Sequence, residues 1–552
     1  MLRKTACPML TALLALVLAA CQPSDIGQTD TTVETSAAED LAPLPEMPAG
    51  QLGDAVIPQR YVLDLTIVPE RDRFSGRVAI AVDINEPSRR IWLHGNRLNV
   101  SEAWLEQGDV RIDGEYAQVD DTGIARLELV ASPEAGAGTL HFEYDAPFDR
   151  ALEGLYKVVE DERAYAFTQF EATSARLAFP GFDEPVFKTP FEIHVTAPAD
   201  DTVITSTGEF ASRAVGEGLV RRSYAVTPPL PTYLIAFAVG PLDVVEWEPV
   251  PPNEIRGWPL PLRGVAAAGK GGQLEFALEH TARLVHVLER YFDYEMPYPK
   301  LDIIAVPDFA AGAMENVGAI TYREQLLLLD ESDSVGRKRA YASVHGHELA
   351  HQWFGNLVTP KWWDDIWLNE SFATWMAAKA AEEAFPDLGF EDQMLGRAIG
   401  VMNADALASA RQVREPVESN HDIANAFDGI TYAKGGAVLS MFEAWVGEEA
   451  FRDGVRLHMQ RFAHDVADYE DFLTSLAEGA GREDLVEAFS SFLFQPGVPL
   501  IAAELSCAGD SPTLGVTQSR YLPLGSGASR DQQWALPLCV RYGDDDESGR
   551  HC

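Results

Sequence analysis

The segment VHGHELAHQWFGNLVTPKWWDDIWLNESFATW contains residue types that can bind a metal ion and activate water. His347 and His351 lie at i and i+4, so on a helix they project from the same face and both imidazoles can reach one ion. Glu348 projects about 100° further round the helix, which places it beside the ion, where it can hold a water, rather than as a third ligand. His-Glu-x-x-His is a zinc signature of metalloproteases, but a solvated polar helix face would also account for so short a pattern.

A third candidate ligand, Glu370, lies in a second helical pattern, LNESFATWMAAKAAEEAF, for which we predict Asn369 as the N-cap. The connector contains Gly and several Trp residues and lets the two helices pack side by side. Two neutral imidazoles and one carboxylate leave a zinc ion one open position for water, which is typical of a catalytic site. His345 projects about 200° away from His347, so we expect it to pack or to support a ligand rather than to bind metal.

The composition indicates a globular protein of several domains. The chain has 552 residues, of which 46% are hydrophobic, so two to four domains with real cores are expected. The formal net charge of -42 argues against nucleic-acid binding, because a phosphate backbone would be repelled. Solubility is the simplest interpretation of this charge, and the alternative is steering of cationic substrates.

The N-terminus has the features of an export signal. MLRKTACPMLTALLALVLAACQPSD has a basic start and an apolar run that is short for a spanning helix. The ending Leu18-Ala19-Ala20-Cys21 resembles the lipobox of bacterial lipoproteins, so we expect a signal peptide over residues 1–21 and lipidation of Cys21. Gln22 after that cysteine favours an outer-membrane lipoprotein facing the periplasm. An ordinary cleaved signal, giving a soluble periplasmic or secreted protein, is the alternative. Residues 22–50 are poor in large apolar side chains and are predicted to be a disordered tether.

Hydrophobic periodicity changes twice along the rest of the chain. Residues 51–243 show period-two runs such as YVLDLTIV and FSGRVAIAVDI, which predict an all-β domain. Residues 244–498 begin with Pro and Gly and continue with helical patterns such as LEFALEHTARLVHVLERYF, which predict a mainly helical domain. Residues 499–552 return to short alternating runs, too few for an independently stable sheet.

The cysteines fit an oxidising compartment. Once the signal is removed and Cys21 is lipidated, Cys507, Cys539 and Cys552 remain, which allows one disulfide and leaves one thiol. The chain has no Cys-x-x-Cys pair, so a zinc ribbon is not expected.

The two histidines, the connector FGNLVTPKWWDDIWLNE and the upstream segment GAMEN at 312–316 are together similar to the zinc aminopeptidases of the aminopeptidase N family. The His-Glu-x-x-His-(x18)-Glu pattern is that of gluzincins, and GAMEN narrows the resemblance to this family. It implies a multidomain α+β fold over about residues 51–552, with an N-terminal β-saddle, a thermolysin-like catalytic domain and the start of a small β-sandwich. The family's helical C-terminal domain has no counterpart before Cys552, as expected for a fragment of a longer gene product. One zinc ion, held by His347, His351 and Glu370, is implied as the cofactor.

Recognition of a free amino terminus requires negative charge, because an unpaired ammonium in a partly desolvated cleft is severely penalised. Glu315 of GAMEN can supply that charge. The resemblance adds Gln169 and Glu171 of the segment FTQFEATSARLAFPGFDEP, although Glu171 taken alone could be an ordinary strand carboxylate. It also implies that the GAMEN backbone lies along the substrate, with Gly312 and Ala313 as main-chain contacts. The predicted substrate-binding residues are Gln169, Glu171, Gly312, Ala313, Met314, Glu315 and Asn316.

The resemblance assigns Tyr432, in DGITYAKGGAVL, as the donor that stabilises the oxyanion, with a core tyrosine as the alternative. Together with Glu348 as general base, this predicts a zinc aminopeptidase that removes the first residue from peptides with a free amino terminus. No nucleic-acid partner is expected, and contact with a membrane is expected only through the lipid anchor. A thermolysin-like endopeptidase and a non-catalytic scaffold of the same fold are the alternatives.

Overall fold

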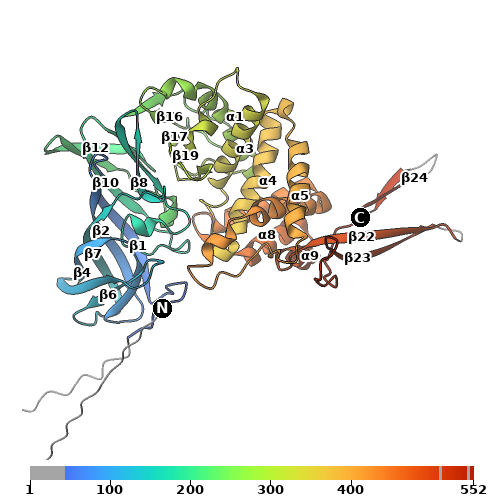
Figure 1. Ribbon diagram of the computed structural model, residues 1–552, viewed down its shortest axis with the longest axis horizontal. Helices are drawn as coiled ribbons and strands as arrows, with labels where there is room; N and C mark the ends of the chain where they lie inside the picture. Colours follow the sequence, from blue (N-terminus) through green and yellow to red (C-terminus); the bar gives the residue numbers. More distant parts are fainter. Residues whose placement is uncertain (1–43, 509–511, 544–547, 552) are drawn as a thin grey trace, which may run out of the picture. The chain divides into compact units, whose positions relative to one another are not determined.

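The computed structural model describes residues 44–508, 512–543 and 548–551 (Figure 1). The predicted signal peptide, Cys21 and most of the predicted tether lie outside the described residues. Pro45 accepts a hydrogen bond from Arg90 and Gly50 accepts one from Asn420, so packing begins a few residues before the expected boundary at residue 50. None of the helices within the described ranges has the length and apolar character that crossing a bilayer requires.

Two sheets form the N-terminal part of the chain, and alternating burial along the strands places apolar side chains in a core. The first sheet has ten strands in the order β12-β13-β10-β1-β2-β7-β4-β5-β6-β3, antiparallel except for the parallel pair of β1 and β10. The second sheet is antiparallel, with the order β11-β14-β9-β8. The strands are β1 (Val56–Thr66), β2 (Arg73–Ile84), β3 (Arg90–His94), β4 (Asn99–Gln107), β5 (Val110–Gln118), β6 (Ile124–Leu129), β7 (Gly136–Pro147), β8 (Gly154–Glu160), β9 (Arg163–Gln169), β10 (Phe191–Pro198), β11 (Thr202–Thr205), β12 (Glu209–Gly216), β13 (Leu219–Tyr224) and β14 (Phe237–Gly240).

A third sheet, which the sequence did not predict, is formed by strands that lie before and after α1 (Glu275–Phe292) in the chain. Its order is β15-β16-β17-β19-β18, with the pairs β16–β17 and β17–β19 parallel and both edge strands antiparallel. β15 spans residue 243, so the boundary that we predicted between residues 243 and 244 falls inside a strand of this sheet. The bounds are β15 (Leu242–Glu246), β16 (Leu262–Ala267), β17 (Leu301–Val306), β18 (Ala313–Met314) and β19 (Ala319–Arg323).

The helices follow as the periodic patterns predicted, and most of them are drawn in yellow to orange in Figure 1. Asn369 does not cap α4: the helix begins at Ile366, and Asn369 lies inside its first turn. The bounds are α1 (Glu275–Phe292), α2 (Glu324–Leu327), α3 (Val335–His351), α4 (Ile366–Ala384), α5 (Phe390–Asp405), α6 (Gly435–Val446), α7 (Glu448–Phe462), α8 (Tyr469–Ala480) and α9 (Asp484–Leu493), with a short parallel pair of β20 (Thr359–Pro360) and β21 (Val466–Ala467).

Two hairpins end the described chain. They pair β22 (Val498–Ser506) with β23 (Thr513–Tyr521), and β24 (Val540–Gly543) with β25 (Ser548–His551). Cys507 is a free, exposed thiol, and Cys539 takes part in a disulfide bond. A β-rich N-terminal part, a mainly helical part and C-terminal strands follow one another, so the predicted α+β fold class is confirmed.

Candidate metal centre and active-site cavity

Two packed helices bring the three predicted ligands together. His347 and His351 lie on the last turns of α3, and Glu370 lies near the start of α4. The Nε2 atoms of the two histidines are 3.0 Å apart. Oε2 of Glu370 lies 3.2 Å from Nε2 of His347 and 3.6 Å from Nε2 of His351. Among the described residues these three form one cluster that could hold a metal ion.

The surroundings of the two imidazoles fit a metal ion. Nδ1 of His351 lies 3.1 Å from the carbonyl oxygen of Phe354, and Nδ1 of His347 lies 3.5 Å from Oγ1 of Thr374. Each ring can therefore keep its proton on Nδ1 and turn the lone pair of Nε2 inward. Ligand atoms around a tetrahedral zinc ion with bonds of about 2.0–2.1 Å are about 3.3 Å apart. The three measured separations bracket that value, so the donor set fits zinc.

The charges at this cluster also favour the binding of a cation. Burial disfavours a charge on His351, but Glu315 and Glu370 outweigh it and raise the pKa of His351 to about 10. Burial alone would raise the pKa of Glu370, but hydrogen bonds with His347 and His351 hold it at about 2. The cluster therefore favours one positive charge at its centre, and a divalent cation can take the place of that proton.

A cavity of about 390 Å³ adjoins the cluster, and four glutamates contribute to its lining: Glu171, Glu315, Glu348 and Glu370. Oε1 of Glu171 and Oε1 of Glu315 are buried without a hydrogen-bond partner among the described residues. Burial and then the charge of Glu315 raise the pKa of both Glu171 and Glu348. Oε1 of Glu315 faces Nδ1 of His351 only at 4.0 Å, which is too long for a hydrogen bond. Buried carboxylate oxygens that accept no hydrogen bond are costly, so this arrangement favours a cationic ligand that donates several hydrogen bonds.

The segment 312–316 forms part of the wall of this cavity: the side chains of Ala313 and Glu315 line it, and Gly312 contributes its main chain. β18 is an edge strand, so its outer main-chain groups face no other strand of the sheet. Gly312, Ala313 and Glu315 line the cavity. Met314 and Asn316 do not, because successive side chains of an extended chain point to opposite faces. The Oδ1 atom of Asn316 instead accepts a hydrogen bond from Thr321 at 3.1 Å.

The end of β9 brings in the residues expected from the N-terminal part. Phe170 is buried against Phe179 and Phe237, which directs its neighbours Gln169 and Glu171 the other way. Glu171 lines the cavity. Gln169 is not among the lining residues, and its Nε2 donates to the sulfur of Met314 at 3.4 Å. Its Oε1 is buried without a partner among the described residues.

Tyr432 lines the cavity next to His347. The two rings are stacked, with their centroids 6.2 Å apart. It lies in a single π-type turn over residues 430–434. Burial and then the charge of Glu370 raise the pKa of Tyr432, so the phenol keeps its proton and can donate a hydrogen bond.

The turn that carries Tyr432 is fixed directly to the ligand helix. Oγ of Ser371, the residue after Glu370, donates to the carbonyl oxygen of Thr431 at 2.6 Å. Any side chain at Gly435 would clash, because a Cβ there would lie 1.9 Å from Oγ of Ser371. Glycine at this position thus allows the close approach that joins the metal ligand to the tyrosine turn.

His345 lies away from the cluster, as expected from the helix geometry. Its Nδ1 lies 2.7 Å from the hydroxyl of Tyr322 and its Nε2 lies 2.9 Å from Oγ1 of Thr281. Burial lowers the pKa of His345 to about 3, so the ring is neutral. It ties α3 to α1 and to β19, the strand that pairs with β18.

Two family models match the chain and carry the names of one family. The Peptidase M1 N-terminal domain matches residues 57–234, and the Peptidase family M1 domain matches residues 276–492. The chain belongs to peptidase family M1. This confirms the resemblance to the zinc aminopeptidases of the aminopeptidase N family, and the zinc dependence of family M1 agrees with the His-His-Glu cluster.

Named members of family M1 are similar over most of this chain. Aminopeptidase M1-A of Oryza sativa subsp. japonica is 35% identical over 501 residues, which are 88% of this chain and 55% of the relative. Aminopeptidase M1 of Arabidopsis thaliana is 34% identical over 499 residues, with the same coverage of both chains. Puromycin-sensitive aminopeptidase of Caenorhabditis elegans is 32% identical over 506 residues, 88% of this chain and 52% of the relative. The chain therefore spans about half the length of these relatives.

Within this M1 site, two amides that sequence reasoning missed hold the backbone of Glu315. Nε2 of Gln352 and Nδ2 of Asn356 donate to the carbonyl oxygen of Glu315 at 2.9 and 2.8 Å. Both amides are buried, and both lie within five residues after His351 in HQWFGN. The sequence offered one signal for these two amides, which is that they lie soon after His351. Because α3 ends at His351, helical spacing does not predict the direction of their side chains.

Arg397 on α5 was also missed. Among the described residues that line the cavity it is the one arginine or lysine, and no carboxylate within the described chain pairs with it. Its Nη2 donates to Oγ of Ser343 at 2.9 Å. Burial lowers the pKa of Arg397. Nothing in the local sequence of α5 marked this residue, since its position depends on how α5 packs against α4.

Proposed function

We propose that this chain is a zinc-dependent aminopeptidase of family M1 that removes the N-terminal residue from peptides. The observation that carries the proposal is that Glu171 and Glu315, each with a buried Oε1 atom that accepts no hydrogen bond from the described residues, share one cavity with the His347, His351 and Glu370 cluster. An ammonium group bound by those carboxylates fixes the peptide by its amino end. The first peptide bond then lies next to the cluster, and bonds further along do not.

One zinc ion per chain would be held by His347, His351 and Glu370. When bound, it would supply a Lewis acid that polarises the substrate carbonyl and lowers the pKa of water. Glu348 takes the proton from the attacking water and passes it to the leaving amine. The hydroxyl of Tyr432 donates to the oxygen that becomes negative in the transition state.

The remaining side chains orient the peptide. Glu315 and Glu171 accept hydrogen bonds from the α-ammonium, and the amide oxygen of Gln169 is available as a third acceptor. The free edge of β18 around Gly312 and Ala313 pairs with the extended peptide main chain. Arg397 is placed to bind an oxygen of the peptide beyond the first residue.

Glu315→Gln tests the recognition of the amino end. Glutamine keeps the volume but removes the charge, so kcat/KM for a leucyl fluorogenic amide should fall by about 30- to 1000-fold, the effect of about 2–4 kcal/mol. Zinc content, measured by elemental analysis, should not change. Glu331→Gln is the matched control, because that side chain is 70% exposed and pairs with Lys338 at the surface.

A comparison of free and N-acetylated peptides decides between this proposal and a thermolysin-like endopeptidase. The aminopeptidase requires the free amine and leaves N-acetylated peptides intact. Equal cleavage of both forms, or an unchanged kcat/KM in Glu315→Gln, would contradict the proposal.

Removal of zinc should lower thermal stability as well as activity. A ligand that binds only the folded chain contributes about 2.7 kcal/mol at one hundred times its Kd, so the Tm should fall when a strong chelator is added and recover when zinc is restored. His351→Ala should have a lower Tm than the unaltered chain with zinc, and its Tm should not change when zinc is removed or restored. His421→Ala is the control, because His421 is 68% exposed and lies outside the site. A zinc response in His351→Ala equal to that of the unaltered chain would rule out this metal site.

We also propose that the protein is exported and anchored by a lipid on Cys21, facing the periplasm from the outer membrane. The support is the basic start, the short apolar run and the Leu-Ala-Ala-Cys ending of the N-terminal sequence. Mass spectrometry of the N-terminal peptide from cells would show an acylated Cys21, and an unmodified mature N-terminus elsewhere would contradict the anchor.

A further inference from the structure

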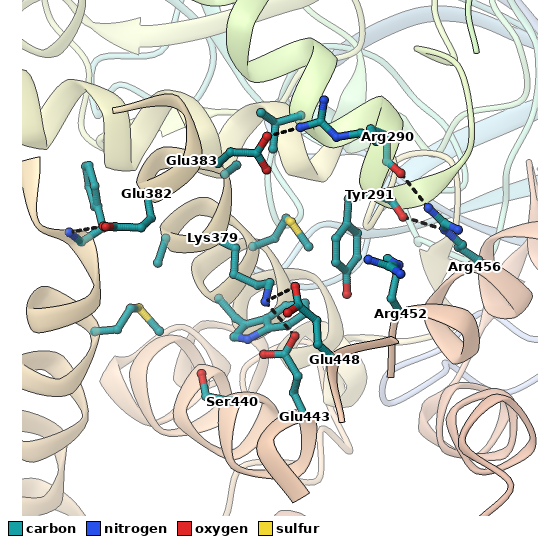
Figure 2. A pocket seen from close by; sticks show the side chains of 17 residues that line it. Arg290, Tyr291, Lys379, Glu382, Glu383, Ser440, Glu443, Glu448, Arg452 and Arg456 are labelled. Atoms are coloured by element: carbon teal, nitrogen blue, oxygen red, sulfur yellow. Dashed lines mark hydrogen bonds and ion pairs between the residues drawn. The ribbon is translucent and has the colours of Figure 1, made fainter. Parts of the chain in front are cut away.

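A second cavity, of about 670 Å³, lies where α1, α4, α5, α6 and α7 meet (Figure 2). It shares no lining residue with the active-site cavity. Both cavities adjoin α4, which carries Thr374 to the first and Trp375 to the second. Because successive helical residues point about 100° apart, the two cavities lie against different faces of that helix. A ligand in the second cavity therefore does not occupy the position proposed for the substrate.

Most charged groups around this cavity already have partners. Nζ of Lys379 donates to Glu443 at 2.8 Å and to Glu448 at 3.3 Å. Arg290 pairs with Glu383, and Glu382 accepts a hydrogen bond from the backbone amide of Phe390. Arg456 donates to two main-chain carbonyl oxygens at the end of α1. These contacts fix the walls.

Two donors are left without an acceptor. The hydroxyl of Tyr291 and Nε of Arg452 are buried and have no hydrogen-bond partner among the described residues. The side chain of Tyr291 is only 9% exposed. Figure 2 shows the guanidinium of Arg452 beside the ring of Tyr291, and the charge of Arg452 acts on the hydroxyl of Tyr291. Buried donors without acceptors cost free energy, so this corner of the cavity favours a ligand oxygen.

The hydroxyl of Tyr291 keeps its proton at neutral pH and can therefore donate a hydrogen bond. Burial and then the charge of Glu443 raise the pKa of Tyr291, while Arg452 acts in the opposite direction. Among the described residues no carboxylate forms an ion pair with Arg452, so its guanidinium can pair with a ligand anion. A group with two oxygens and a single negative charge satisfies both donors at once.

The rest of the wall favours an apolar body attached to that group. The indole of Trp375 packs edge-on against the ring of Tyr291, with centroids 5.9 Å apart, and Met376 and Met394 add thioether surface. A phosphate dianion fits less well, because it would introduce a second negative charge near Glu443 and Glu448. The volume lies within the usual range for small-molecule sites, about 300–1,000 Å³.

We propose that this cavity binds a small organic monocarboxylate, whose oxygens accept hydrogen bonds from Tyr291 and Arg452 and whose apolar part lies against Trp375 and Met376. The proposal goes beyond peptide hydrolysis and does not depend on it. It assigns a second ligand site to the catalytic part of the chain.

Binding of N-acetyl-L-leucinate to the zinc-loaded full chain, measured by isothermal titration calorimetry, tests the site. The acetyl group removes the ammonium that the active site would require, and the probe keeps a carboxylate and an apolar side chain. We expect one site per chain. Arg452→Gln should weaken binding by about tenfold or more, the usual effect of losing a charged hydrogen bond, and Tyr291→Phe should weaken it by about three- to tenfold.

Matched controls separate this site from general effects. Arg461→Gln lies on the same helix, α7, but Arg461 pairs with Glu478 at the surface, so the affinity should not change. Tyr291→Phe removes only an oxygen that has no partner, so its Tm should match that of the unaltered chain, which shows that lost binding is not lost folding. N-acetyl-L-leucinamide, which lacks the charge, and acetate, which lacks the apolar part, should bind at least tenfold more weakly.

Several results would overturn the proposal. These are no detectable binding of N-acetyl-L-leucinate, equal binding of the amide, tighter binding of inorganic phosphate, or unchanged affinity in both Arg452→Gln and Tyr291→Phe. Loss of binding in His351→Ala with full binding in Arg452→Gln would place the probe at the metal cluster of the active-site cavity and would equally overturn the proposal.

Discussion

Replacing Glu348 by glutamine should lower kcat for a free-amine peptide by about 10²- to 10⁴-fold, to the limit of detection in most assays, while zinc remains bound. Glutamine has the shape of glutamate but cannot accept a proton. Glu348 is 5% exposed, lies on α3 between the two histidines and lines the cavity without belonging to the metal cluster. Its loss therefore removes proton transfer and leaves the ligands in place.

Zinc analysis and thermal melting should accompany the kinetics of Glu348→Gln. Glu279→Gln on α1, an exposed glutamate away from the cavity, is the control and should keep full activity. A Glu348→Gln chain that retains more than about a tenth of kcat would exclude the residue as the general base. A chain that has lost zinc would show instead that Glu348 supports the metal site.

The sequence predicted the metal cluster because its geometry is local. His347 and His351 lie on one helix, and the spacing along α3 determines that both face α4. The position of Glu370 depends on a second helix that packs against α3. The helical pattern after Trp363 predicted that helix. The contacts of His345 with Thr281 and Tyr322 agree with the prediction that it turns away from the ion.

Features that depend on tertiary packing were not predictable in the same way. The run LDIIAV of β17 is buried at every position, and periodicity cannot distinguish such a strand from a buried helical segment. The predicted cap at Asn369 was wrong because α4 starts at Ile366, after a short helical turn, while the carboxylate of Asp365 is held by Arg414 and Trp367.

The two cavities show why sequence motifs reveal one site and not another. GAMEN placed Glu315 next to the cluster, and the resemblance added Glu171, but neither pattern indicated that the oxygens of both would lack partners. Tyr291 and Arg452 belong to helices α1 and α7, far apart in the sequence, and each looks like an ordinary helical residue. Only the packed bundle shows that both are donors without acceptors.

Tyr432→Phe should lower kcat by about 10²- to 10³-fold, the effect of removing one oxyanion donor worth about 2.7–4 kcal/mol. KM should change little, because the hydrogen bond is formed in the transition state and not with the bound substrate. The phenylalanine ring preserves the packing against His347, and the link from Ser371 to Thr431 still holds the turn. Zinc content and Tm should therefore be unchanged.

A phosphinic peptide analogue provides the sharper measurement, because its tetrahedral oxygens resemble the transition state. Its affinity should fall in Tyr432→Phe by about the same factor as kcat, while the affinity of the free substrate does not. Tyr521→Phe, in which an exposed tyrosine of β23 is changed, should alter neither value. If Tyr432 were only a packing residue, Tyr432→Phe would keep its kcat and its affinity for the analogue. A matched loss of both assigns the hydroxyl to the oxyanion, since no other property of the side chain has changed.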